Sequence, residues 1–290
     1  MTAVELKIED HLPEAYAVAS RASARGQREF RQLTRASLLL LIVAAVGGAI
    51  APTWGGWVSA AAFLASIVLT ALAIYWKTEQ DWYDGRASAE SVKSLGFKYA
   101  IGGEPLGATD PDADGRFAEA LAALTSELRA LSSTVVPAPG GPVLGALREL
   151  RARPLAERRA AYREQRIEEQ RAWYSRRARE HRATARRWRA VMFAGQAAGV
   201  AGAALKGLGV LDVDLLSIFA TLAAATAAWI AAGDFTETAR AYDFALLDLG
   251  QALEGVDRAE SEEEWARFVA DCEQAMSREH TMWLARRRVH

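Results

Sequence analysis

Charged and apolar residues are strongly segregated along this chain. From Ala36 to Trp76 there is no Asp, Glu, Lys or Arg over 41 residues. A helix needs about 20 apolar residues to cross the hydrocarbon core of a bilayer, so this run is long enough for two spans and a turn. Proline and paired glycines break helices, which places the turn at 51–57. The pattern predicts spans at about 36–50 and 58–76, the first of them starting as a helix before Ala36.

A second apolar region repeats this arrangement. Residues 190–205 and 215–233 are uncharged, and a glycine-bearing turn separates them. They predict two further spans, of which 190–205 is the weaker because alanine and glycine dominate it. The alternative is a buried helical hairpin of a soluble protein, and a 41-residue uncharged stretch argues against it. We therefore expect an all-α integral membrane protein with two helical hairpins, hence four transmembrane helices, and a cytoplasmic helical layer.

The arginines predict how the hairpins are oriented. Five of them precede the first span, and residues 146–189 hold fifteen arginines against six acids. The positive-inside rule then places the open ends of both hairpins, and both termini, in the cytoplasm. Two hairpins inserted in the same orientation form a parallel repeat, whereas an inverted repeat is typical of alternating-access transporters.

Several residues are candidate interface anchors. Tryptophan is enriched at the membrane–water interface, which favours this role for Trp54 and Trp57. Four of the arginines before the first span share one helical face. A voltage sensor or a phospholipid clamp is the alternative, but voltage-sensing arginines lie inside a span rather than beside it. These four arginines are Arg21, Arg25, Arg28 and Arg35.

The charged parts of the chain predict a cytoplasmic layer of helices. Helix is expected at 77–100, continuing the second span, then at 117–131, 143–189 with a break at Pro154, 234–253 and 262–288. Segment 248–279 holds ten acids and three arginines, so we expect it to pack near the arginine-rich stretch. The predicted division is a first two-span unit at 1–131, a proline-rich linker at 132–142 and a second two-span unit at 143–290.

Two groups of motifs resemble the SLATT family, the SMODS and SLOG-associating two-transmembrane effector domains. The first is similar through residues 82–95, which begin Trp-Tyr-Asp-Gly-Arg, followed by Tyr99 and Gly102-Gly103-Glu104-Pro105. The second resembles another subfamily through Gln170-Arg171-Ala172-Trp173-Tyr174 and Ala241-Tyr242. The resemblance implies a pore-forming membrane effector of a bacterial defence system. Members of the family often accompany a separate nucleotide-making or nucleotide-binding component, so the resemblance implies a nucleotide-sensing partner. No sensing domain is recognisable in these 290 residues, so the sequence does not identify the trigger.

Little in the sequence indicates catalysis or metal binding. There is one cysteine, Cys272, and the four histidines are far apart, so no enzyme activity, cofactor or metal is expected. A net charge of −1 argues against a nucleic-acid partner. Asp110, Asp112 and Asp114 match the first half of a calcium loop, but the acid expected six residues after Gly115 is Leu121. An acidic surface turn is the favoured interpretation there.

Polar and small residues inside the spans are the better functional clue. Two stripes could form a pore wall, because hydroxyls wet a conduit without the cost of a charge. They could equally serve helix packing, since small residues let backbones approach. Gly195, Gly199 and Gly202 share one face and favour packing. The pore-lining candidates are Ser59, Ser66 and Thr70 in one span and Ser217, Thr221, Ala225 and Ala228 in another.

These observations converge on a homo-oligomeric pore or channel in the bacterial inner membrane, with the lipid bilayer and permeating ions as its partners. No charge lies in the middle of a span, which argues against a proton-coupled carrier. A non-conducting membrane scaffold that recruits a cytoplasmic partner is the alternative, and a small transporter is a weaker one.

Overall fold

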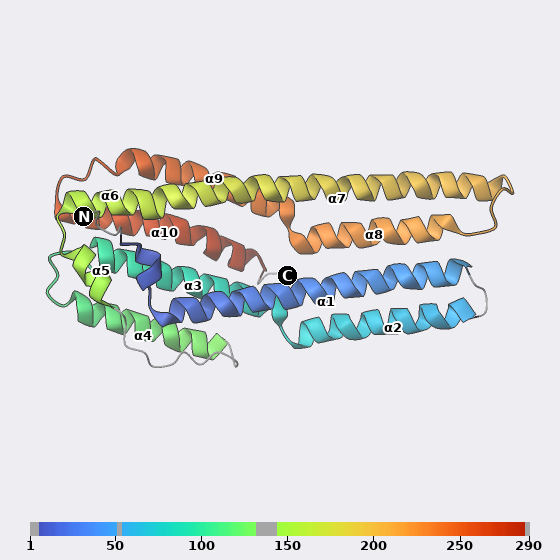
Figure 1. Ribbon diagram of the computed structural model, residues 1–290, viewed down its shortest axis with the longest axis horizontal. Coiled ribbons are helices and arrows are strands. Elements are labelled where there is room, and N and C mark those ends of the chain that lie inside the picture. The colour runs from blue at the N-terminus through green and yellow to red at the C-terminus, as the bar shows by residue number, and fades with distance from the viewer. Residues whose placement is uncertain (1–5, 51–53, 132–143, 288–290) are drawn as a thin grey trace. The chain divides into compact units, whose positions relative to one another are not determined.

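The computed structural model describes residues 6–50, 54–131 and 144–287, so the predicted linker at 132–142 lies outside the described residues. Within those ranges the chain forms helices and no strand, which confirms the all-α prediction (Figure 1). Two short elements, η1 and η2, are a 3-10 helix and a π-helix. The elements are η1 (Ile8–His11), α1 (Glu14–Ile50), α2 (Trp54–Tyr75), α3 (Thr78–Ile101), α4 (Ala113–Leu131), α5 (Leu144–Arg151), α6 (Leu155–Tyr162), η2 (Arg163–Glu168), α7 (Glu169–Gly207), α8 (Leu215–Gly233), α9 (Phe235–Gly255) and α10 (Glu262–Arg287).

The helices gather into two compact units, and each unit draws on both halves of the sequence. One combines Gly26–Glu79 with Arg177–Arg240 and is called the hairpin unit here. The other combines Met1–Arg25, Gln80–Arg176 and Ala241–His290 and is called the layer unit. The apolar runs fall in the hairpin unit, whereas most of the acidic residues fall in the layer unit.

The hairpin unit contains two antiparallel helix pairs, α1 with α2 and α7 with α8 (Figure 1). Three helical stretches are long and apolar enough to cross a membrane: Glu14–Ile50, Trp54–Ile101 and Leu215–Gly255. Within each, a segment of 18 residues has a mean hydropathy of 2.0, 2.2 and 1.9, respectively. Helix α7 is not among them, because its alanines and glycines are less hydrophobic than the leucines and isoleucines of the others. Its segment 190–205 forms the predicted hairpin with α8, and its crossing of the membrane stays a prediction.

Each hairpin ends in a residue with left-handed backbone conformation. We expected one helix to continue from the second span to residue 100, and this was wrong. Helix α2 ends at Tyr75 and α3 begins at Thr78, because Lys77 has a φ of 50° and cannot continue a right-handed helix. Asp234 has a φ of 45° and separates α8 from α9 in the same way. This shared break supports the description of the chain as a repeat.

The layer unit packs around α3. Phe97, Tyr99 and Ile101 are buried on that helix, and α4 covers Tyr99 with Phe117, whose ring centroid lies 4.7 Å from the tyrosine ring. Helix α10 approaches the end of α3 so closely that a side chain at Gly103 would lie 2.5 Å from a Val269 methyl group. The break expected at Pro154 is confirmed, because α5 ends before it and α6 starts after it.

Candidate functional site

A cluster of hydroxyl groups joins α1 to α2 inside the first hairpin. Ser37 Oγ lies 2.8 Å from Ser66 Oγ and 3.0 Å from Thr70 Oγ1, and both serines are buried. Hydroxyls away from water need hydrogen-bond partners, so each helix supplies partners for the other. Sequence reasoning missed Ser37, although it is the only hydroxyl residue in 36–50.

Ser59 extends the same seam toward the turn of the first hairpin. Its hydroxyl donates to the carbonyl of Ala44 at 2.6 Å. A side chain at Gly47 would lie 3.0 Å from Ser59 Oγ and 3.2 Å from the carbonyl of Gly55, so glycine lets the two backbones approach here. Within one chain, Ser59, Ser66 and Thr70 therefore bond to α1. That they line a conduit stays a prediction.

The second hairpin is closed by a glycine seam instead of hydroxyls. Gly195, Gly199 and Gly202 are all buried on the face of α7 that meets α8. A side chain at Gly199 would lie 3.3 Å from Phe219 Cβ, and one at Gly202 would lie 2.6 Å from Leu215 Cβ. The absence of side chains at these positions sets the spacing of the pair, as small residues commonly do between membrane helices.

The candidate stripe of α8 turns mainly away from this seam. Ser217 and Ala228 are exposed, Thr221 is half-buried and Ala225 is buried. The Thr221 hydroxyl donates to the carbonyl of Ser217 at 2.9 Å. At the start of the helix, Asp214 accepts hydrogen bonds from the hydroxyl and the backbone N–H of Ser217. These bonds hold the pKa of the Asp214 carboxyl below its usual range, so the cap stays ionised.

The expected interface anchors lie on the surface. Trp54 and Trp57 are 66% and 81% exposed, and all four candidate arginines are exposed. Arg35 is held with its Cζ 4.9 Å from the centroid of the Trp229 ring, a cation–π contact between α1 and α8. Beside it, Leu38 packs on a cluster of Ala185, Trp229 and Phe235, which joins the two hairpins.

A groove of about 300 Å³ lies at the turn end of the first hairpin, and it is wholly apolar. It has no hydrogen-bonding side chain apart from the indole of Trp54, so it is unsuited to a polar substrate. The lining residues are Ile42, Val43, Val46, Gly47, Ile50, Trp54 and Val58.

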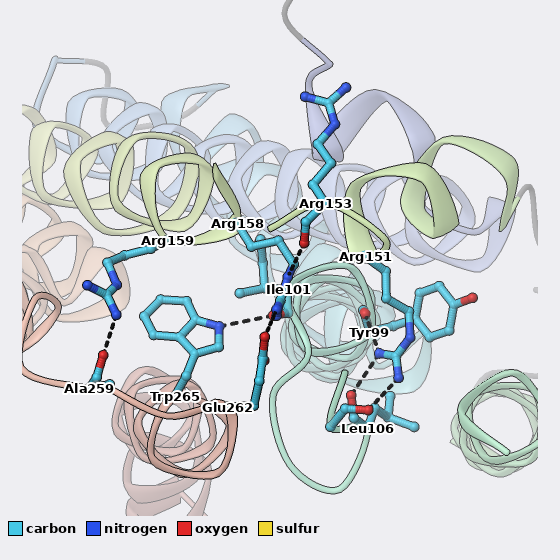
Figure 2. A network of polar contacts seen from close by, with 11 residues as sticks. Tyr99, Ile101, Leu106, Arg151, Arg153, Arg158, Arg159, Ala259, Glu262 and Trp265 are labelled. Atoms are coloured by element: carbon cyan, nitrogen blue, oxygen red, sulfur yellow. Dashed lines mark hydrogen bonds and ion pairs between the residues drawn. The ribbon is translucent and has the colours of Figure 1, made fainter. Parts of the chain in front are cut away.

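In the layer unit, arginines cap the end of α3, as Figure 2 shows. The last carbonyls of a helix lack partners within the helix, and cations are favoured near them. The buried Arg158 donates to the carbonyl of Ile101 at 2.7 Å and pairs with Glu262. Trp265 Nε1 donates to the same carbonyl at 3.0 Å, and Arg151 donates to the carbonyl of Tyr99 at 2.9 Å.

A buried ion pair links the arginine-rich stretch to α10. Arg166 donates to both carboxylate oxygens of Glu273, at 2.9 and 2.7 Å, and Tyr162 donates to one of them at 3.0 Å. Burial lowers the pKa of Arg166, but the charge of Glu273 and the hydrogen bonds to it outweigh this effect and raise the pKa, so the guanidinium stays protonated. With the pair between Arg163 and Asp257, these contacts confirm that the acidic segment packs on the arginine-rich one.

Two of the three aspartates of the calcium candidate pair with different arginines. Asp110 accepts from the N–H of Asp112 at 3.0 Å and pairs with Arg116. Asp114 accepts a hydrogen bond from the Tyr99 hydroxyl and pairs with Arg148. The hydrogen bond from Tyr99 lowers the pKa of the Asp114 carboxyl. Among the described residues, no three His, Cys, Asp or Glu side chains gather in a way that could hold a metal ion.

Comparison with protein-family models found two adjacent matches. Residues 13–159 match the model described as SMODS and SLOG-associating 2TM effector domain 3, and residues 162–283 match effector domain 1 of the same family. No curated protein and no solved structure matched the chain. The two matches each contain one helical hairpin, and together they cover most of the sequence. The chain therefore belongs to the SLATT family and carries two of its two-transmembrane effector domains in tandem.

Proposed function

We propose that this protein is a non-enzymatic effector that opens a pore in the bacterial inner membrane as a homo-oligomer. The SLATT effector domains and the apolar helices support the coarser statement, a membrane effector of a defence system. A separate nucleotide-sensing component is the proposed trigger, consistent with a family described as associating with SMODS and SLOG.

The outward face of α8 is the observation that carries the proposal. Apart from Leu216, its exposed residues are one serine and five alanines, namely Ser217, Ala220, Ala224, Ala227, Ala228 and Ala231. On α2 the exposed residues include Phe63, Leu64, Ile67 and Val68, as expected of a helix facing lipid. A small, partly hydroxylated face suits a neighbouring helix or a wetted conduit better than it suits acyl chains.

This difference assigns roles to the two hairpins. Helix α2 faces lipid, while α8 faces the axis of the oligomer, where several subunits together enclose the conduit. The described spans carry no charge at their middle, so a proton-coupled transporter is not favoured.

Ion flux into liposomes, paired with the subunit number in detergent, tests the proposal. Thr221→Leu adds bulk and removes a hydroxyl on the α8 stripe, so flux should fall while assembly persists. Ala61→Leu adds bulk on the exposed face of α2 and is the matched control, expected to change neither. Ser66→Leu is expected to disturb the first hairpin, because Ser66 is buried against Ser37.

The outcomes separate the candidate functions. Lost flux with an intact oligomer supports the pore. Lost assembly for Thr221→Leu would make the stripe a packing surface. A reproducible absence of ion flux through the correctly assembled wild-type protein would favour the non-conducting scaffold.

The proposed orientation places both termini in the cytoplasm, and cysteine labelling in intact cells tests it. Cysteines placed near Gly55, at the exposed Gly56, or near Gly209 should react from outside, and one near Gly140 should not. The native thiol of Cys272 should not be labelled, because Cys272 is 7% exposed and burial raises its pKa to about 12. Strong outside labelling at Gly140 would contradict the orientation.

A further inference from the structure

The two ends of the hairpin unit differ sharply in charge. At one end, segments 26–36, 75–79, 177–189 and 234–240 carry eleven basic and five acidic side chains. The rest of the unit, 37–74 and 190–233, carries only Lys206, Asp212 and Asp214. This end therefore has a strong excess of positive charge directly beside long apolar helices.

Part of that charge lies level with the uncharged part of α8. Ala185 packs against Trp229, and the Trp188 ring lies 6.3 Å from the Trp229 ring. Trp229 precedes the end of α8 by four residues, which at 1.5 Å per residue is about 6 Å inside the apolar segment. Arg186 and Arg187 lie between Ala185 and Trp188 in the sequence. They are therefore at the height of the uncharged helix α8, not past its end.

These arginines and tryptophans form what we call the collar. It consists of Arg35, Arg186, Arg187, Trp188, Arg189 and Trp229. Some members are held in place: Arg35 lies over the Trp229 ring, and Arg189 donates to Thr236 at 2.8 Å. Others are free to bind, since Arg186 and Arg187 are exposed and have no polar partner among the described residues.

Two acids of the same unit are engaged by arginines outside the collar. Glu180 pairs with Arg177, and Glu237 pairs with Arg240, so both are committed to other arginines. In addition, the indole N–H of Trp229 is buried and has no acceptor among the described residues. The collar thus offers two unpaired guanidinium groups and an unsatisfied donor at the level where a helix leaves the hydrocarbon.

We infer that the collar binds the phosphate groups of anionic phospholipids in the adjoining leaflet. Arginine presents planar, bidentate donors that match a phosphate, and its long stem lets the charge reach the headgroups from beside hydrocarbon. Nucleic acid is a poor occupant, because the neighbouring surface is apolar at this level. This inference does not depend on ion conduction.

Retention of lipid by the full-length protein tests it. Protein is reconstituted in nanodiscs of equal phosphatidylglycerol and phosphatidylcholine, extracted into mild detergent, and its bound lipids are counted by native mass spectrometry. Wild-type protein should be enriched in phosphatidylglycerol. Because one arginine near an anionic surface contributes about fivefold in affinity, Arg186→Gln with Arg187→Gln should weaken that enrichment by roughly 25-fold.

A matched control is available in the layer unit. Arg176 and Arg258 are also exposed and without a polar side-chain partner among the described residues, so Arg176→Gln with Arg258→Gln removes the same charge elsewhere. This control should keep its phosphatidylglycerol. Replacement of Arg186 and Arg187 by lysine should retain part of the enrichment, because the charge remains while the bidentate geometry is lost.

Three results would overturn the inference. An equal loss of phosphatidylglycerol enrichment in the collar and control variants would mean that the overall positive charge of the protein, not the collar, attracts the lipid. Unchanged enrichment in a collar variant whose oligomer size is normal would mean that these arginines do not bind it. Displacement of the lipid by soluble glycerol phosphate at millimolar concentration would mean that the site recognises a free phosphate rather than a membrane headgroup.

Discussion

The two units of the molecule use opposite means to bring helices together. The layer unit buries charge: Arg166 and Glu273 are 2% and 0% exposed and form two hydrogen bonds. The hairpin unit relies on close approach at glycines and on short hydroxyl contacts such as Ser37 with Ser66. Buried ion pairs are costly to break, whereas hydrogen bonds between membrane helices contribute little individually.

The same residue type also has a different role in each unit. In the layer unit Arg158 is buried and bonds to helix carbonyls, whereas in the hairpin unit Arg186 and Arg187 are exposed and unpaired among the described residues. An excess of arginine therefore does not by itself indicate a surface for binding. The distinction depends on whether carbonyls or acids from distant segments meet the guanidinium group.

The largest loss of stability should come from breaking the buried ion pair between Arg166 and Glu273. Arg166→Met leaves the buried Glu273 without its cationic partner, which should cost about 3–5 kcal/mol of stability. In a chain of this size that corresponds to a fall of about 10 °C in the apparent melting temperature. Circular dichroism of the full-length protein in detergent would measure it.

Two further variants sharpen this prediction. Combining Arg166→Met with Glu273→Leu should recover most of the loss, because an apolar pair removes the orphaned charge. Arg153→Met breaks only surface pairs, with Glu149 and Glu157, and should cost about 1 kcal/mol or less. If the double variant were as unstable as the single one, packing rather than charge would explain the site.

A smaller but clear effect is expected at the glycine seam. Gly202→Val forces a side chain against Leu215, where Cβ atoms would be 2.6 Å apart, and overpacking of this kind costs about 1–3 kcal/mol. Gly207→Ala, which meets nothing within 4 Å, is the control. Equal melting temperatures for the two variants would show that α7 and α8 can separate freely.

The smallest effect should come from the hydroxyl seam. Removing one hydroxyl with Ser37→Ala or Ser66→Ala should cost about 0.6 kcal/mol, the average for such bonds in membranes. A double-mutant cycle with both changes isolates the pair, because the second substitution then has no bond left to break. A coupling energy of zero would mean that each serine bonds equally well elsewhere, which Thr70 permits for Ser37.

Many features of the fold follow from sequence pattern alone. The 41-residue uncharged run predicts a hairpin, Pro154 predicts a helix break, and the opposite charges of 146–189 and 248–279 predict that these segments pack together. Each of these predictions depends on local composition or on net charge, and both can be counted directly from the sequence. The resemblance to two SLATT domains is also carried by short motifs, and the family-model matches over residues 13–159 and 162–283 confirm it.

The tertiary structure decided which residues meet. Periodicity placed Ser66 and Thr70 on one face of a helix, but only the packing of α1 identified Ser37 as their partner. Likewise Arg166 is separated from Glu273 by 107 residues, and nothing local distinguishes it from its exposed neighbours. The left-handed turns at Lys77 and Asp234 also escaped prediction, because neither residue type requires that conformation. Helical period defines a face, whereas the rotation of each helix depends on its neighbours, and long-range packing alone supplies that information.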